Sequence, residues 1–200
     1  MLNQLINIDK DLFLLINQGL SNPFFDWLLP ILRNPYTWAP LYLFLIIFFI
    51  KTYGKVGILV VAFTLANFGV SDAVSSHIIK KSVKRVRPCN DLVFKNEVNI
   101  RVRCGSGFSF TSSHATNHFA MAFFWIVLFR RKWKHTTWLA ITWAFMISVS
   151  QIYVGVHYPF DILCGALLGI AIGMGMGYLF KRFFPKFLEP APLNPDTTLA

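Results

Sequence analysis

The chain has 200 residues, of which 55% are hydrophobic, 16% aromatic and only 14% charged. Soluble domains carry about 25% charged residues, so a chain this apolar has too little polar surface to cover itself in water, and the bilayer is the better solvent. The formal net charge of +10 could suit a nucleic acid. The basic residues stand in short clusters between apolar runs, however, which is typical of a polytopic membrane protein, so no nucleic acid is expected as a partner.

Residues 1–35 are mixed in character, with leucines and isoleucines set among Asn, Asp and Gln. This pattern predicts one or two amphipathic helices at the membrane interface. Asp9 and Asp11 stand where a signal peptide would have a basic segment leading into an uninterrupted apolar core, so no signal peptide is expected. A sixth, poorer membrane span over 12–32 is the alternative.

Five apolar runs approach or reach the roughly 17–25 residues that a membrane-spanning helix needs. They cover 37–50, 56–79, 113–129, 136–154 and 158–180. We therefore expect an all-α, polytopic transmembrane helical bundle of five, alternatively six, spans. One membrane domain would cover 36–187, followed by a Pro-rich, disordered tail over 188–200.

Basic residues in short loops indicate the orientation of the spans. With five spans, three basic clusters fall on one side, which is assigned to the cytoplasm: Lys51 and Lys55; Arg130, Arg131, Lys132 and Lys134; Lys181, Arg182 and Lys186. The loop over 80–112 then lies on the outer face, although it holds eight Lys and Arg residues. An anionic ligand explains this exception better than attraction to lipid headgroups.

Cys89 and Cys104 bracket a polar part of this loop, while Cys164 lies inside the last apolar run. In a loop that faces an oxidising compartment the first two could form a disulfide. Two free thiols are the alternative, and the spacing does not decide between them. No second pair of Cys or His ligands accompanies them, so a zinc site is not expected.

Two further features lie within the spans. Asp72 is an ionisable residue at membrane depth, which indicates either a functional group or a hydrogen bond to a neighbouring helix. The last run has glycine at every fourth position, at Gly165, Gly169, Gly173 and Gly177. A stripe of small residues lets another helix approach closely, so this stripe predicts packing.

Two helix beginnings fall on the expected outer face. The sequence Thr111-Ser112-Ser113-His114 precedes the third apolar run, and Ser or Thr is a good N-cap. The unpaired N–H groups and the positive dipole end of a helix N-terminus suit a phosphate. His114 would then lie in the first turn, beside the anion.

The second beginning contains His157, Pro159 and Asp161. Pro159 fits a first helical turn, which places His157 just before the helix and Asp161 one turn later. The carboxylate could then hold one imidazole nitrogen and leave the other free to attack. A structural histidine in a capping contact is the alternative.

Lys80 and Arg87 follow the second run, and together they could clamp phosphate oxygens, Arg87 as a planar fork and Lys80 as a point charge. A basic cluster that rests on lipid headgroups is the alternative. The five-span topology brings this pair and both helix beginnings to one face of the membrane. Such a set of groups can carry out phosphoryl transfer through a phosphohistidine.

These elements resemble the type 2 phosphatidic acid phosphatases, whose pattern is K-x6-RP, then PSGH, then SR-x5-H-x3-D. The chain has Lys80-x6-Arg87-Pro88, then Thr111-Ser112-Ser113-His114, then Ser150-Gln151-x5-His157-x3-Asp161. The resemblance covers residues 80–161. Three dispersed parts at fixed spacing are far more specific than any one of them.

The resemblance implies an integral membrane lipid phosphatase that uses no metal and no other cofactor. In such an enzyme His157 attacks phosphorus, Asp161 orients it and His114 protonates the leaving oxygen, after which water hydrolyses the phosphohistidine. The phosphate would be held by Lys80, Arg87, Ser112, Ser113 and Gln151.

The main departure from the family pattern is Gln151, which stands where the family has an arginine. A neutral amide can donate hydrogen bonds, but charge-assisted ones are about twice as strong. The cations that could compensate are Arg85, Arg101 and Arg103 of the basic loop.

His118 follows His114 by four residues, so both imidazoles could face the same side. A third ligand for zinc is not evident, and nearby cations would repel a metal, so His118 is expected as a wall of the pocket. Arg85 is a second candidate for a supporting position around the site.

No residue selects the lipid. The resemblance and the small size favour undecaprenyl pyrophosphate, in the bacterial inner membrane with the site facing the periplasm or exterior. The alternatives are phosphatases of lipid A, phosphatidic acid or phosphatidylglycerol phosphate, and a lipid phosphotransferase. A lipid-phosphate-binding membrane protein without turnover is the alternative from another class. The oligomeric state stays open.

Overall fold

The computed structural model of the chain describes residues 2–185. Every regular element within this range is a helix and none is a strand, as the sequence predicted. The tail expected over 188–200 lies outside the described residues.

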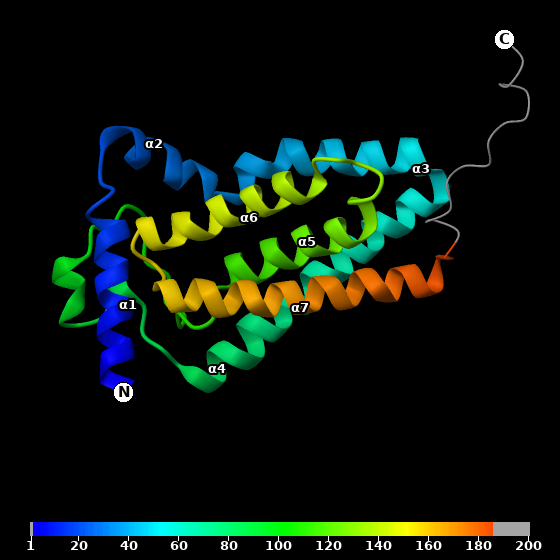
Figure 1. The fold of residues 1–200 in the computed structure, drawn as a ribbon. Helices are drawn as coiled ribbons and strands as arrows, with labels where there is room; N and C mark the ends of the chain where they lie inside the picture. Colours follow the sequence, from blue (N-terminus) through cyan, green and yellow to red (C-terminus); the bar gives the residue numbers. More distant parts are fainter. Residues whose placement is uncertain (1, 186–200) are drawn as a thin grey trace, which may run out of the picture.

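The N-terminal helix α1 (Leu2–Asn17) stands across one end of the helical bundle (Figure 1). Its inner face consists of Asp9, Phe13 and Asn17, which recur every fourth residue and are fully buried. Phe13 packs on the rings of Phe94 and Tyr158, at centroid distances of 5.5 and 5.7 Å. Several leucines and isoleucines of the other faces are exposed, and the interfacial position of this helix stays a prediction.

Helix α2 (Pro23–Leu32) begins at the cap residue Asn22, whose side-chain oxygen accepts the N–H of Phe25 at 3.0 Å. The short α2 lies alongside the end of α6 and leads directly into α3 (Figure 1).

Helix α3 (Pro35–Asp72) is not straight, because Gly54 has a φ of +55° and breaks the helical path. The chain reverses there, and the limb over 35–53 is followed by an antiparallel limb over 55–72 (Figure 1). Gly57 lies directly against the carbonyl oxygen of Phe49, which only a residue without Cβ allows. The second limb continues through a π-helical segment, η1 (Ala73–Ile79), into α4 (Lys80–Val83).

The basic loop contains two short 3₁₀ turns, η2 (Pro88–Asn90) and η3 (Phe94–Glu97). The remaining helices are α5 (Ser113–Phe129), α6 (Thr136–Tyr153) and α7 (Pro159–Phe183). Their limits agree with the predicted runs to within three residues.

Two helical segments, Pro35–Val83 and Pro159–Phe183, are long and apolar enough to cross a membrane by length and composition. The first contains both limbs of α3, so it has the length of two spans. The total of five or six spans stays a prediction.

Within the described residues, the most extensive contact between helices is that of α5 with α7, which the glycine stripe allows. A Cβ at Gly169 would collide with the carbonyl oxygen of Thr116, and a Cβ at Gly173 with that of Ala120. All four glycines of the stripe are buried, so the packing role predicted for it is confirmed.

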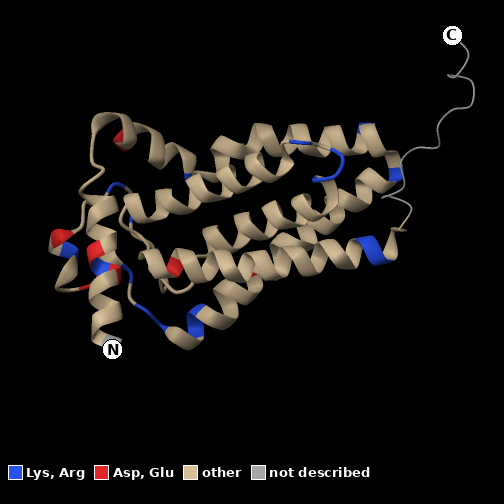
Figure 2. Cartoon of the chain, in the orientation of Figure 1, with Lys and Arg blue, Asp and Glu red and all other residues tan. Residues whose placement is uncertain are grey.

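Figure 2 shows Lys and Arg at both ends of the bundle, whereas Asp and Glu gather towards the end where α1 lies. The same end holds the basic loop and the beginnings of α5 and α7 (Figure 1). The candidate site therefore lies at the end of the bundle that carries both acidic and basic residues.

Candidate functional site

The beginnings of α5 and α7 are joined directly. The N–H of Ser112 donates to the backbone carbonyl of Asp161 at 3.1 Å, and the Ser112 hydroxyl accepts the N–H of Ala115 at 3.4 Å. Ser112 is fully buried and thus caps α5 from inside the protein. The N–H groups of Ser113 and His114, which have no acceptor within the helix, are left as the donors of this N-terminus.

His157 lies in the turn between α6 and α7, with only 2% of its surface exposed. The backbone carbonyl of Gln151 accepts the N–H groups of Val156 and His157, at 3.1 and 3.2 Å, and so fixes the turn. Nδ1 of His157 lies 3.5 Å from Oδ2 of Asp161. This separation places the ring beside the carboxylate but is too long for a hydrogen bond, and Nδ1 has no other partner among the described residues.

Arg87 places its Nη1 3.3 Å from Nε2 of His157. A guanidinium only donates, so Nε2 accepts and the proton of the neutral imidazole is on Nδ1, facing Asp161. Burial lowers the pKa of His157 to about 4, Asp161 opposes this, and the charges of Arg87 and Lys80 lower it further. The imidazole is therefore neutral near pH 7, with the lone pair of Nε2 on the side of Arg87.

The carboxylate of Asp161 accepts hydrogen bonds from Tyr158 and Arg85. Its Oδ2 accepts the N–H of Tyr158 at 2.9 Å, within a capping box, and its Oδ1 accepts Nη1 of Arg85 at 2.9 Å. The other arm of Arg85 donates to Asp9 at 2.6 Å, and the guanidinium stacks 4.0 Å from the Tyr158 ring. Arg85 thus connects Asp161 to α1.

Asp72 has one partner on α5 and another on η1. Its Oδ1 accepts the amide of Asn117 at 3.1 Å and the hydroxyl of Ser76 at 3.2 Å, and that hydroxyl lies 2.8 Å from Oγ of Ser113. Asp72 therefore makes the hydrogen bonds to a neighbouring helix that the sequence left open as one of two roles. The network fixes the register of α3 and η1 against the first turns of α5.

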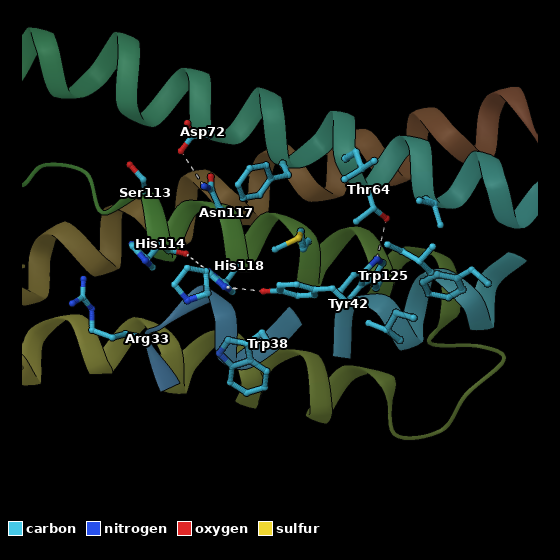
Figure 3. A pocket seen from close by; sticks show the side chains of 18 residues that line it. Arg33, Trp38, Tyr42, Thr64, Asp72, Ser113, His114, Asn117, His118 and Trp125 are labelled. Atoms are coloured by element: carbon cyan, nitrogen blue, oxygen red, sulfur yellow. Dashed lines mark hydrogen bonds between the residues drawn. The ribbon is translucent and has the colours of Figure 1, made fainter. Parts of the chain in front are cut away.

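A cavity of about 470 Å³ opens beside the first turns of α5 (Figure 3). One end holds polar groups, among them Arg33, Ser113 and His114. The walls between the two limbs of α3 and α5 are apolar, and they are formed by Leu45, Ile46, Phe49, Val61, Leu65, Phe68 and Met121.

His118 forms part of the wall of this cavity. Its Nδ1–H donates to the carbonyl oxygen of His114 at 2.7 Å, and its Nε2 lies 3.4 Å from the Tyr42 hydroxyl. Its ring is stacked parallel to that of His114, at a centroid distance of 6.2 Å. These contacts fix the first turn of α5 from which His114 projects.

Gln151 is fully buried on α6, and neither its amide nitrogen nor its amide oxygen has a partner among the described residues.

The described residues contain no group of three His, Cys, Asp or Glu side chains that could hold a metal ion.

The structure joins Cys89 to Cys104 by a disulfide, with their Cα atoms 6.0 Å apart. The disulfide lies next to Arg87, whose Nε donates to the carbonyl oxygen of Gly107 at 2.8 Å. The amide of Asn90 donates to the carbonyl oxygen of Gly105 at 2.9 Å. The two halves of the basic loop are thereby held together around the Arg87 side chain.

Sequence reasoning missed two residues near the site, Asp9 and Arg33. The spacing of Asp9, Phe13 and Asn17 by four residues was a signal that one face of α1 is buried. Nothing in the sequence marks Arg33, which lies between two apolar segments and belongs to no motif.

Known proteins resemble this chain in sequence and in fold. The family model of the PAP2 superfamily matches residues 55–185. A lipid A 4'-phosphatase of Bacteroides thetaiotaomicron is 33% identical over 98% of this chain and 85% of its own length. An undecaprenyl-diphosphatase of Sulfolobus acidocaldarius is 33% identical over 67% of this chain and 59% of its own length.

Among solved structures, the crystal structure of Aquifex aeolicus LpxE superposes with a TM-score of 0.65 and 25% identity, covering 83% of this chain and 92% of that one. Because the matched family segment contains both helix beginnings and the whole basic loop, the sequence motifs, the fold and the relatives agree, and the chain belongs to the PAP2 superfamily.

Proposed function

We propose that the chain removes a phosphate monoester from lipid A. Its family makes it a membrane phosphatase that acts on lipid phosphate esters. The observation that carries the choice of lipid is the similarity to a lipid A 4'-phosphatase, which runs along almost the whole chain. Undecaprenyl pyrophosphate, which the sequence analysis favoured, is supported less well, because the similarity to an undecaprenyl-diphosphatase covers a smaller part of both chains.

In the first step, the lone pair of His157 Nε2 attacks phosphorus, and the bond from phosphorus to the lipid oxygen breaks. The leaving oxygen takes a proton from His114. The negative charge of the bound phosphate favours the protonated form of His114 before this step. Asp161 stabilises the positive charge that develops on the His157 ring and holds Nδ1 towards itself, as a carboxylate does for a nucleophilic histidine.

In the second step, water attacks the phosphohistidine, and His114 accepts the proton that the water loses. The bond from phosphorus to Nε2 breaks, inorganic phosphate leaves and His157 is neutral again. Lys80, Arg87 and the N–H groups of Ser113 and His114 hold the phosphoryl oxygens in both steps.

The position of Arg87 supports these roles. It donates to the nitrogen assigned as nucleophile, so a phosphoryl group that bonds to Nε2 is formed within reach of the guanidinium. The apolar cavity that begins at His114 provides a path for one hydrocarbon chain of the lipid. With five spans, the site would face the periplasm or exterior of a bacterial inner membrane.

The test is phosphate release by the purified chain in detergent, with EDTA present, from lipid A, undecaprenyl pyrophosphate, phosphatidic acid and phosphatidylglycerol phosphate. We expect the highest kcat/KM on lipid A, and mass spectrometry of the product identifies which phosphate is removed. His157→Ala should abolish release, while His135→Ala, an exposed histidine away from the motifs, should retain it.

Higher kcat/KM on undecaprenyl pyrophosphate would overturn the choice of lipid but keep the mechanism. Label transferred from radioactive lipid phosphate to a second lipid, without free phosphate, would show a phosphotransferase. Lipid binding without either product would show a binding protein.

A further inference from the structure

The phosphate-binding cations of this site are one fewer than the family pattern provides, because Gln151 replaces an arginine. The replacement is not a surface change, since Gln151 is fully buried and both polar atoms of its amide lack a partner in the described chain. An unpaired buried amide costs free energy unless something in the functional state satisfies it. The question is therefore which cation acts in place of the missing one.

Two arginines of the basic loop are already committed to other groups. Arg85 is paired with Asp9 and Asp161 at 2.6 and 2.9 Å. Arg101 is paired with Asp26, and its guanidinium stacks 4.0 Å from the ring of Tyr153. Neither guanidinium can turn to a phosphate without losing these contacts.

Arg103, the third candidate from the sequence, has an exposed side chain and does not line the cavity beside His114. The basic loop thus offers no buried cation to this cavity. The replacement has to come from another segment.

Arg33 differs from all three. It lies at the junction of α2 and α3 and lines the same end of the cavity as Ser113 and His114 (Figure 3). Its Nε is buried and has no partner, and the guanidinium forms no ion pair with any residue that the structure describes. Burial lowers the pKa of this guanidinium, so its charge is kept at a cost that a bound anion would offset.

The position of Arg33 is set by the packing of its segment on α6. The Tyr153 hydroxyl donates to Asp26 at 2.7 Å, and Trp38 packs edge-on against Trp143 at 6.1 Å. The segment over 26–38 therefore runs antiparallel to α6 between these two contacts, and Gln151 lies on the same stretch of α6. Arg33 thus reaches the site from the segment that packs on α6, the helix that carries Gln151.

The positive charge of Arg33 acts on Arg87 of the site. Burial lowers the pKa of Arg87, Asp161 opposes this, and the positive charge of Arg33 lowers it further. An anion bound between the two guanidinium groups would offset this repulsion.

We propose that Arg33 is a phosphate-binding residue, which supplies from the junction of α2 and α3 the cation that Gln151 does not supply from α6. The anion is the phosphoryl group of the substrate, so this assignment rests on the proposed function. Arg33 would contact phosphoryl oxygens next to His114.

The test measures binding of inorganic phosphate to the full chain in detergent, by titrated thermal shift, and inhibition by orthovanadate of whatever lipid hydrolysis the chain shows. Arg33→Gln should raise the Kd for phosphate and the vanadate Ki by at least about tenfold, the loss expected for one charge-assisted contact. Arg33→Lys should fall between, because it keeps the charge without the fork. Arg182→Gln, an exposed arginine at the other end of α7, should match the wild type.

The compensation is tested by the pair Arg33→Gln with Gln151→Arg. Adding the arginine on α6 should restore phosphate affinity to within about threefold of the wild type, since it returns one charge-assisted contact. Melting curves without phosphate show whether each variant is folded, and Arg33→Lys provides the comparison if Arg33→Gln is not.

An unchanged Kd and Ki in a folded Arg33→Gln, with both raised in Arg87→Gln, would overturn the assignment. Failure of the proposed function gives a different result. In that case the wild type releases no phosphate from any lipid, while phosphate affinity still depends on Arg33. Lipid A hydrolysis with an Arg33-independent Kd would refute only the assignment of Arg33.

Discussion

Oδ2 of Asp9, on the first helix, lies 2.6 Å from Nη2 of Arg85, in the loop that follows α4. The second oxygen of Asp9 accepts the N–H of Phe160 at 2.9 Å, in the first turn of α7. Arg85 in turn donates to Asp161. The carboxylate next to the proposed nucleophile is thus positioned from the N-terminus of the chain, through contacts that join three distant segments.

Asp9→Asn should lower kcat by about tenfold, equivalent to ~1.4 kcal/mol of transition-state stabilisation, with little change in KM. The amide can still accept from Phe160, but it loses the ion pair that keeps Arg85 on Asp161. The free energy of unfolding should fall by about 1–3 kcal/mol, the worth of a hydrogen bond to a charged group. Steady-state kinetics and thermal unfolding in detergent measure the two effects.

Asp11→Asn is the matched control, because Asp11 is exposed on the same helix and should be neutral in both measurements. A double-mutant cycle of Asp9→Asn with Arg85→Gln separates positioning from general stability. We expect the two kcat effects to be strongly non-additive. Full additivity would mean that the contact has no role in holding Asp161.

The pH dependence of kcat/KM reports on His157 of the free protein, which must be neutral to attack. Burial lowers its pKa to about 4, so most of the nucleophile gains a proton only when the pH falls below that value. At pH 5 about 90% of such a histidine is neutral, against about 3% for one with the ordinary pKa of about 6.5. The protonation of His157 should therefore cause no loss of kcat/KM between pH 7 and pH 5. A loss of kcat/KM with a midpoint near 6.5 that persists in His135→Ala, a variant of an exposed histidine, would show that His157 titrates as an exposed histidine.

Local patterns predicted most of the fold. The limits of α5, α6 and α7 follow from apolar runs, and α5 has in addition the cap residue Ser112 at its beginning; both signals are local. The reversal at Gly54 was not predicted as such, although two separate spans were expected there. A single glycine in an apolar segment is compatible with either a continuous helix or a turn, and packing of Gly57 on Phe49 decides between them.

The candidate site, too, depends partly on local patterns and partly on packing between distant segments. The residues of the three motifs meet because their spacing is local and the topology brings helix beginnings to one end. Asp9 and Arg33 lie more than 45 residues before the first motif residue, Lys80, so no spacing rule connects them to it. Their roles depend on which faces of α1 and α2 are buried, and this is set by contacts with α6 and α7.

The stripe on α7 allows a prediction from two glycines of one helix. Gly173→Ala should destabilise the chain by about 1–3 kcal/mol, because the new Cβ has no space beside the carbonyl oxygen of Ala120. Gly175→Ala should stabilise it by up to ~1 kcal/mol, since nothing lies near that Cβ and alanine favours the helix. Thermal unfolding of both variants in detergent checks the opposite signs. Equal effects would show that α5 and α7 are further apart than described.

The disulfide of Cys89 with Cys104 allows a prediction about the basic loop. It closes a loop of 15 residues in sequence separation, and cross-links of that length stabilise by ~3 kcal/mol. Reduction, or replacement of both cysteines by serine, should lower the melting temperature by several degrees. It should also raise the KM for lipid several-fold, because Gly105 and Gly107 would no longer be held next to Arg87.

Mass spectrometry of the unreduced protein should find the two cysteine peptides linked. Two alkylatable thiols at these positions would contradict both the cross-link and the assignment of this loop to an oxidising side of the membrane.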